Sequence, residues 1–76
     1  MIRLEIISPE KEILSADVSR VELPGICGRF VVLDMHAPLI TALNEGKVCW
    51  NEDESITIKG GFVQVKDNVV RVLVEQ

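Results

Sequence analysis

The chain has 76 residues, 47% of them hydrophobic, and a formal net charge of −4 from twelve acidic and eight basic residues. A chain of this length makes one domain, residues 1–76, whose small core seldom gives more than about 3–5 kcal/mol of net stability. The acidic balance and the scattered lysines and arginines disfavour nucleic acid as a partner, and no apolar run approaches the roughly 20 residues that span a bilayer, which excludes direct membrane insertion.

The first part of the chain predicts short strands separated by turn residues. Apolar and charged residues alternate over 2–6, which is the period of a half-buried strand. Residues 8–10 interrupt this strand, because proline fixes φ and has no N–H to donate. Further strands are predicted at 13–16 and 18–23, and Pro24-Gly25 then predicts a turn.

Residues 25–43 combine turn glycines, an apolar run and the only histidine of the chain. A strand that is apolar on both faces is predicted over 29–33. The His-Ala-Pro sequence at 36–38 leaves this strand. Residues 39–43 are interpreted as extended, because a proline precedes them and Ile and Thr favour strands. The composition of the whole stretch suggests a contact surface more than a reaction centre.

The remaining part of the chain predicts four more strands, at 47–50, 55–59, 62–66 and 69–74. Gly60-Gly61 predicts a bend or a bulge. Asp67-Asn68 predicts a tight hairpin turn, because both residues tolerate positive φ. No segment shows the sustained 3.6-residue period of a helix. We therefore expect an all-β fold of eight to ten short strands, arranged as a sandwich or a barrel.

The residues that could carry chemistry lack the partners that chemistry needs. His36 has no nucleophile or orienting group at a useful spacing. Cys27, His36 and Cys49 lack the close ligand pairs and the fourth ligand of structural zinc, and the acidic run 52–54 lacks the ligand spacing of a calcium loop. We expect no catalytic residue, no metal site and no cofactor. Trp50 is equally suited to the core and to an interface.

Three blocks of sequence follow a known pattern in the right order and at the right spacing. They are Ser8-Pro9-Glu10 with Val21-Glu22-Leu23-Pro24-Gly25, then Gly28, Phe30, Leu33 and His36-Ala37-Pro38-Leu39, and finally Gly60-Gly61-Phe62 with Asn68 and Val72-Leu73. On these residues the chain resembles, nearly end to end, the N-terminal β-domain of the epsilon subunit of F-type ATP synthases, which is called delta in mitochondria.

The resemblance implies a flattened two-sheet sandwich of about ten short strands, five in each sheet, with no substantial helix. It implies a non-catalytic subunit of the central stalk that binds gamma and couples it to the membrane c-ring during proton-driven or sodium-driven ATP synthesis. The implied location is the cytoplasmic face of the bacterial inner membrane, peripheral through the complex. A free-standing β-barrel that binds a small ligand remains the alternative.

The resemblance also implies two sets of contact residues. The gamma set is Ser8, Pro9, Glu10, His36, Ala37, Pro38, Leu39 and Ile40, and the ring set is Gly28, Arg29 and Phe30. This sequence departs from the family pattern at Arg29, where relatives often carry an acidic or polar residue. It departs again at Val31 and at Asp34-Met35, which predicts a different shape for the loop before His36.

Most members of that family continue into a two-helix C-terminal domain, which binds ATP in some and inhibits the enzyme in many. This sequence stops at Gln76, where the β-domain ends, so residues 1–76 are expected to supply neither function. The β-domain has no long amphipathic segment and no glycine-rich phosphate loop followed by Lys-Ser/Thr that could replace those helices.

Overall fold

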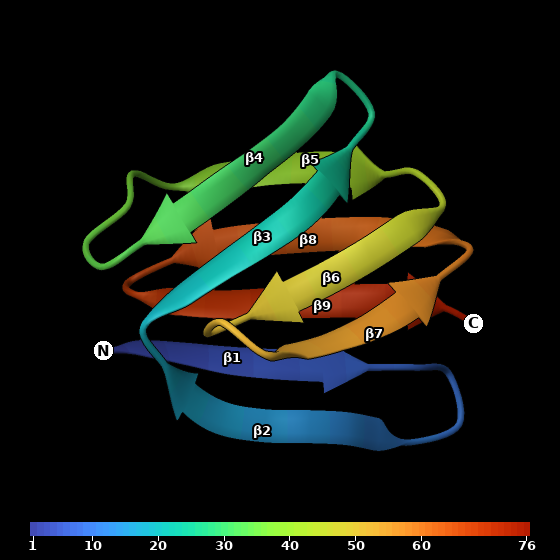
Figure 1. Cartoon of the computed structure of the whole chain (residues 1–76), viewed down its shortest axis with the longest axis horizontal. Helices are drawn as coiled ribbons and strands as arrows, with labels where there is room; N and C mark the ends of the chain where they lie inside the picture. The colour runs from blue at the N-terminus through green and yellow to red at the C-terminus, as the bar shows by residue number, and fades with distance from the viewer.

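The computed structural model describes all residues from 1 to 76 and contains nine β-strands and no helix (Figure 1). The strands are β1 (Ile2–Ile7), β2 (Glu12–Val18), β3 (Arg20–Gly25), β4 (Gly28–Leu33), β5 (Leu39–Leu43), β6 (Gly46–Trp50), β7 (Glu54–Ile58), β8 (Gly60–Lys66) and β9 (Val69–Glu75). This confirms the all-β prediction, including the extended interpretation of 39–43. It also follows that no helix is long and apolar enough to cross a membrane.

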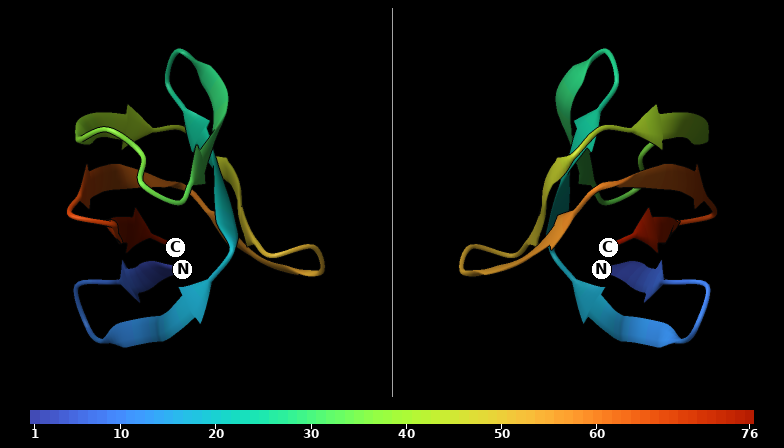
Figure 2. Two further views of the ribbon diagram at one scale, coloured as in Figure 1. Left: turned by 90° about the vertical axis from the view of Figure 1, so that its left-hand side faces the viewer. Right: turned by 90° about the vertical axis from the view of Figure 1, so that its right-hand side faces the viewer.

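The strands form two layers that face each other, as Figure 2 shows. One layer has five strands in the order β2-β1-β9-β8-β5, and the other has four in the order β4-β3-β6-β7. A single bridge between Gly25 and Leu43 joins the layers, so that the hydrogen bonds run through one sheet that curls on itself. The second layer thus has four strands, where the resemblance implied five.

The core lies between the layers and is built from alternate positions of each strand. In β8, Val63 and Val65 are buried, whereas Phe62 and Gln64 point outward. Burying one such branched side chain fully contributes about 1.5–3 kcal/mol, and 15 buried hydrophobic residues form this core. Trp50 is half-buried and packs against the same cluster, so part of its side chain contributes to the core.

Two predicted turns have different outcomes. Asp67 and Asn68 form the β8–β9 hairpin turn with φ values of 52° and 62°, as predicted. The turn predicted at Pro24-Gly25 is wrong by two residues, because both residues continue β3 and pair with Arg29 and Gly28. The chain reverses at residues 26–27. The next residue, Gly28 (φ 124°), provides the positive φ with which β4 begins.

The bend expected at Gly60-Gly61 lies immediately before these glycines. Lys59 forms the bend, and the two glycines begin β8. The backbone N–H of Lys59 donates to the carbonyl of Glu75 at 2.7 Å, which attaches the bend to the end of β9.

Candidate partner-binding surfaces

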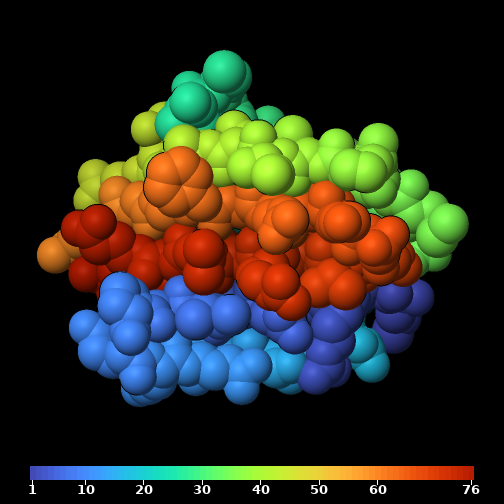
Figure 3. All heavy atoms as spheres, turned by 180° about the vertical axis from the view of Figure 1, so that it is seen from behind, coloured from blue at the N-terminus to red at the C-terminus, as the bar shows by residue number.

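The outer face of the five-stranded layer carries large apolar side chains that the fold leaves in solvent. Ile40 on β5, Phe62 on β8 and Leu73 on β9 are 73%, 59% and 50% exposed. Phe62 pairs directly with Leu73, and the three side chains line one shallow hollow. Figure 3 shows this face as adjoining bands of β5, β8, β9 and β1. We refer to Ile40, Phe62 and Leu73 as the outer apolar patch.

A second hollow extends the outer apolar patch toward the β1–β2 turn. Its volume is about 620 Å³, and Phe62 and Leu73 share its lining with Ser8 and Pro9. The patch therefore connects Ile40 at one end of the face to Pro9 at the other. Two parts of the gamma set that are far apart in sequence, Ser8-Pro9 and Ile40, thus belong to one surface.

Ser8 shapes this turn rather than offering a free side chain. The residue is buried, and its Oγ accepts from the backbone N–H of Lys11 at 3.3 Å and donates to the Lys11 carbonyl at 3.1 Å. Pro9 and Glu10 are exposed. Within this segment, Pro9 and Glu10 are the residues that a partner could reach.

Leu39 and Ile40 point to opposite sides of β5, because successive residues of a strand alternate. Leu39 is half-buried and packs against the core, whereas Ile40 stands on the outer face. Ile40 is therefore the member of this pair whose side chain is accessible from solvent.

Phe62 and Leu73 were not identified from the sequence as members of an exposed apolar surface. The alternation along β8 could have indicated this, because Val63 and Val65 point into the core and Phe62 therefore points outward with Gln64. An apolar residue at an outward position of a half-buried strand is the observation that could have identified them.

An ion pair borders the outer apolar patch. Nε of Arg71 lies 3.0 Å from Oε1 of Glu5, across the β1–β9 pairing. Exposed pairs of this kind add little to stability, on the order of 0–1 kcal/mol. The arrangement of apolar centre and charged border is typical of protein–protein interfaces.

Arg29 is held on the outer face of the four-stranded layer. Its Nε donates to Oε2 of Glu22 at 2.7 Å, and its Nη2 donates to the carbonyl of Lys47 at 2.9 Å. The hairpin tip itself is formed by Ile26 and Cys27, and Ile26 is 54% exposed. The ring set thus lies at the projecting β3–β4 hairpin (Figure 1), but the Arg29 charge is paired and directed toward β6.

The pairing with Arg29 lowers the pKa of the Glu22 carboxyl group, which makes its contribution to stability depend on pH. The hydrogen bond from Arg29, followed by the charges of Arg29 and Arg20, holds the pKa of Glu22 below its ordinary value of 4.5 despite some desolvation. Because the pKa of Glu22 is lower in the folded than in the unfolded chain, the pairing stabilises the fold at pH values above the ordinary pKa. This stabilisation is lost as the pH falls through the pKa of the folded state. An Arg29→Gln variant should raise the pKa of Glu22, measured by NMR titration of its carboxyl carbon. An unchanged pKa would show that Arg29 does not control this group.

His36 lies beside the ring set and away from residues 8–10. It lines a hollow of about 420 Å³ together with Gly28, Arg29 and Phe30. Its Nδ1 lies 2.6 Å from the carbonyl oxygen of Ala37, a contact in which a protonated Nδ1 donates. His36, a member of the gamma set, therefore lies beside the ring set, whereas Pro38 lines another hollow together with Ile40.

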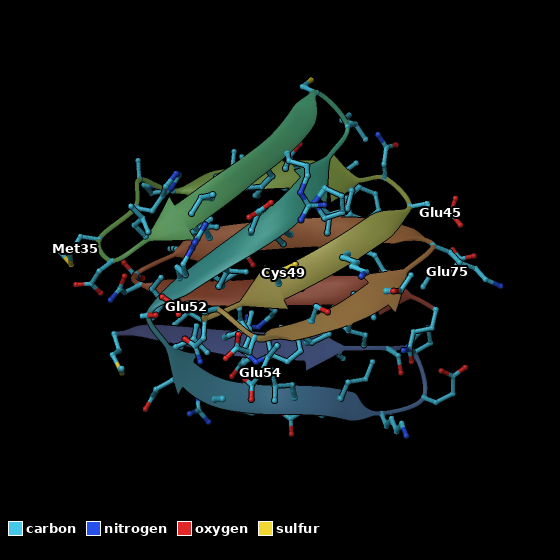
Figure 4. All side chains as sticks on the ribbon, viewed as in Figure 1. Met35, Glu45, Cys49, Glu52, Glu54 and Glu75 are labelled. Atoms are coloured by element: carbon cyan, nitrogen blue, oxygen red, sulfur yellow. The ribbon has the colours of Figure 1, made fainter.

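The other polar candidates do not gather into a site. Cys27 is exposed and Cys49 is half-buried, and both thiols are free. No group of three or more histidine, cysteine, aspartate or glutamate side chains comes together in a way that could hold a metal ion. Cys49 and the acidic run 52–54 lie around β6 and the β6–β7 turn, as Figure 4 shows for Cys49, Glu52 and Glu54.

Comparison with known proteins gives a consistent family signal. The family model described as ATP synthase, Delta/Epsilon chain, beta-sandwich domain matches residues 1–76. The ATP synthase epsilon chain of Pelotomaculum thermopropionicum is 43% identical over 74 residues, covering 93% of this chain and 55% of the relative. The epsilon chain of Anaeromyxobacter sp. (strain K) is 40% identical over 77 residues, with coverage of 97% and 58%. The chain therefore spans little more than half the length of these relatives.

Solved structures show the same fold at lower identity. A chain of the Tetrahymena thermophila mitochondrial ATP synthase central stalk/c-ring structure aligns with a TM-score of 0.85 at 21% identity, covering 99% of this chain and 63% of that chain. A chain of the Euglena gracilis mitochondrial ATP synthase OSCP/F1/c-ring structure aligns with a TM-score of 0.87 at 23% identity, with coverage of 99% and 51%. These matches support the two-layer arrangement described above.

Proposed function

This chain belongs to the family of the ATP synthase delta/epsilon chain β-sandwich domain, and on that premise we propose that it is a non-catalytic part of the central stalk of an F-type ATP synthase. In this proposal it binds the gamma subunit and couples it to the c-ring during ion-driven ATP synthesis. Its place would be the cytoplasmic face of a bacterial inner membrane, where it is held through the complex. The proposal is supported by the names of the relatives, each of which is an ATP synthase epsilon chain.

The observation that carries the gamma half of the proposal is the outer apolar patch. A small soluble domain seldom leaves three large apolar side chains side by side in water without a partner to cover them. The patch has the aromatic centre and charged border that protein interfaces favour, and it links Pro9 to Ile40 within the gamma set. A wild-type chain mixed with an isolated gamma subunit should co-elute with it in size-exclusion chromatography. Separate elution at micromolar concentrations would contradict this half of the proposal.

The ring half rests on the β3–β4 hairpin. The hairpin projects from the sandwich and carries Gly28, Arg29 and Phe30 close to its exposed tip (Figure 1). It belongs to the four-stranded layer, whereas the outer apolar patch lies on the five-stranded layer. Two partners could therefore be engaged at the same time, as a coupling part requires.

Arg29→Glu should weaken coupling to the ring while the domain stays folded. The variant reverses the charge and places a second carboxylate beside Glu22, but both groups are partly exposed, so the stability change should be small. The measurement is proton pumping relative to ATP hydrolysis in reconstituted membranes. Glu22→Gln is the matched control, because it removes the ion pair and leaves the Arg29 cation in place. If Arg29→Glu couples pumping to hydrolysis as well as the wild type does, coupling to the ring does not depend on the charge at position 29.

The alternative of a small-ligand carrier finds no support in the structure. The space between the layers is filled by the core side chains, and the hollows described above are shallow and open to solvent. The strand order also ends in β2 on one side and β7 on the other, so the sheet does not close into a barrel.

A further inference from the structure

The side chain of Asn68 joins three segments that are far apart in the sequence. Its Nδ2 donates to the carbonyl of Met1 at 2.9 Å and to Oδ1 of Asp34 at 2.7 Å. Its Oδ1 accepts from the backbone N–H of Met35 at 2.8 Å. A carboxamide has two donor hydrogens and one acceptor oxygen, and all three are used here. Asn68 thus connects the β8–β9 turn with the first residue and with the β4–β5 loop.

This network holds a segment that crosses between the two layers. The chain leaves the four-stranded layer at Leu33 and enters the five-stranded layer at Leu39. Between them, the backbone N–H of His36 donates to the carbonyl of Leu33 at 3.2 Å. Met35 has a φ of 63°, a value that residues other than glycine seldom adopt. Figure 4 shows Met35 on this loop, pointing away from the sandwich. The hydrogen bonds of Asn68 hold Asp34 and Met35, which come directly before the gamma-set residues 36–38.

We infer that Asn68 is a positioning residue, which holds the 34–38 loop in the conformation in which the loop meets the gamma subunit. The inference rests on the proposed function, because His36, Ala37 and Pro38 belong to the gamma set. Without the carboxamide, the loop keeps the ion pair between Asp34 and the N-terminal amine but loses its two hydrogen bonds with Asn68. We expect the less restrained loop to need ordering when gamma binds. Ordering a loop on binding weakens affinity without removing any contact.

The carboxyl group of Asp34 reports on the same network. The hydrogen bond from Asn68, aided by the nearby N-terminal amine, holds the pKa of Asp34 below its ordinary value. Removing the carboxamide should therefore raise this pKa, which gives a readout in the free domain that is independent of gamma. A role of Asn68 in the hairpin turn alone would leave both the Asp34 pKa and the Met35 amide unchanged.

The test uses three variants that change Asn68 and one control. Asn68→Gly removes the carboxamide but creates Asp-Gly, a pair that favours the same tight turn. Asn68→Asp keeps the acceptor and places a carboxylate against Asp34. The double variant N68D/D34N exchanges donor and acceptor, which restores one hydrogen bond between the loop and the turn. Asp67→Gly is the matched control, because Asp67 lies in the same turn with a positive φ.

We expect Asn68→Gly to stay folded, to exchange its Met35 amide faster and to bind gamma about five- to thirtyfold more weakly. Asp67→Gly should bind within about twofold of the wild type, and N68D/D34N should recover affinity relative to Asn68→Asp. Wild-type affinity in Asn68→Gly, or no recovery in the double variant, would overturn the inference while leaving the proposed function intact. Failure of the wild-type chain to bind gamma would overturn the proposed function itself.

Discussion

An Ile40→Asp variant is expected to fold like the wild type and to bind the gamma subunit at least about a hundredfold more weakly, a change of about 2.7 kcal/mol. Ile40 is 73% exposed, so the free domain loses little when a carboxylate replaces it. In the complex the same carboxylate would be buried without a partner, and leaving a charge unpaired in an interface is strongly unfavourable. Titration calorimetry with an isolated gamma subunit measures the difference.

Ile26→Asp is the matched control for Ile40→Asp. Ile26 is 54% exposed at the tip of the β3–β4 hairpin, in the layer that does not carry the outer apolar patch. The control variant should bind gamma within about threefold of the wild type, since a surface substitution away from the interface changes little. Circular dichroism establishes that both variants are folded. Equal affinities of a folded Ile40→Asp variant and the wild type would exclude Ile40 from the gamma surface.

Gly61→Ala is expected to destabilise the domain by more than about 3 kcal/mol or to prevent folding. A Cβ at Gly61 would lie 2.0 Å from the carbonyl oxygen of Leu73, and the φ of 152° is already unfavourable for a side chain. The neighbouring backbone cannot withdraw, because Gly61 pairs with Val74 within the β8–β9 ladder. Urea unfolding, followed by the fluorescence of the half-buried Trp50, measures the loss.

Gly60→Ala provides the comparison at the adjacent position. Its Cβ would lie 3.5 Å from the carbonyl oxygen of Leu43, which is an ordinary van der Waals contact. We expect this variant to change the free energy of unfolding by no more than about 1 kcal/mol. Unfolding midpoints that coincide for the two variants would show that the close approach at Gly61 does not constrain the sheet.

Local patterns predicted the strands because burial on one face imposes a period of two residues. The alternation in 69–74 therefore located β9 to within one residue, and that in 62–66 located β8 except for its first two residues, which are glycines. The positive φ tolerated by Asp67-Asn68 located the turn between them. The turn at Pro24-Gly25 was misplaced, because proline is compatible with a strand position that needs no N–H. Gly28 rather than Gly25 provides the positive φ.

Contacts between distant segments could not be predicted in the same way. Nothing near Asn68 in the sequence indicates that its carboxamide reaches Asp34, because that contact depends on how β4 passes to β5. The partners of Arg29 are likewise set by the order β4-β3-β6, which brings the Lys47 carbonyl within its reach. The family resemblance named the gamma and ring sets, but only the register showed that Ile40 points outward and Leu39 inward.

The surface that gamma covers can be measured by hydroxyl-radical footprinting of the wild-type chain, free and bound. Oxidation of Ile40, Phe62 and Leu73 should fall strongly when gamma is added, because these side chains are exposed in the free domain and buried in the proposed complex. Oxidation of Ile26 and Val31, on the β3–β4 hairpin of the four-stranded layer, should be the same in the free and the bound chain. Protection confined to Ile26 and Val31, with the outer apolar patch still oxidised, would contradict the account.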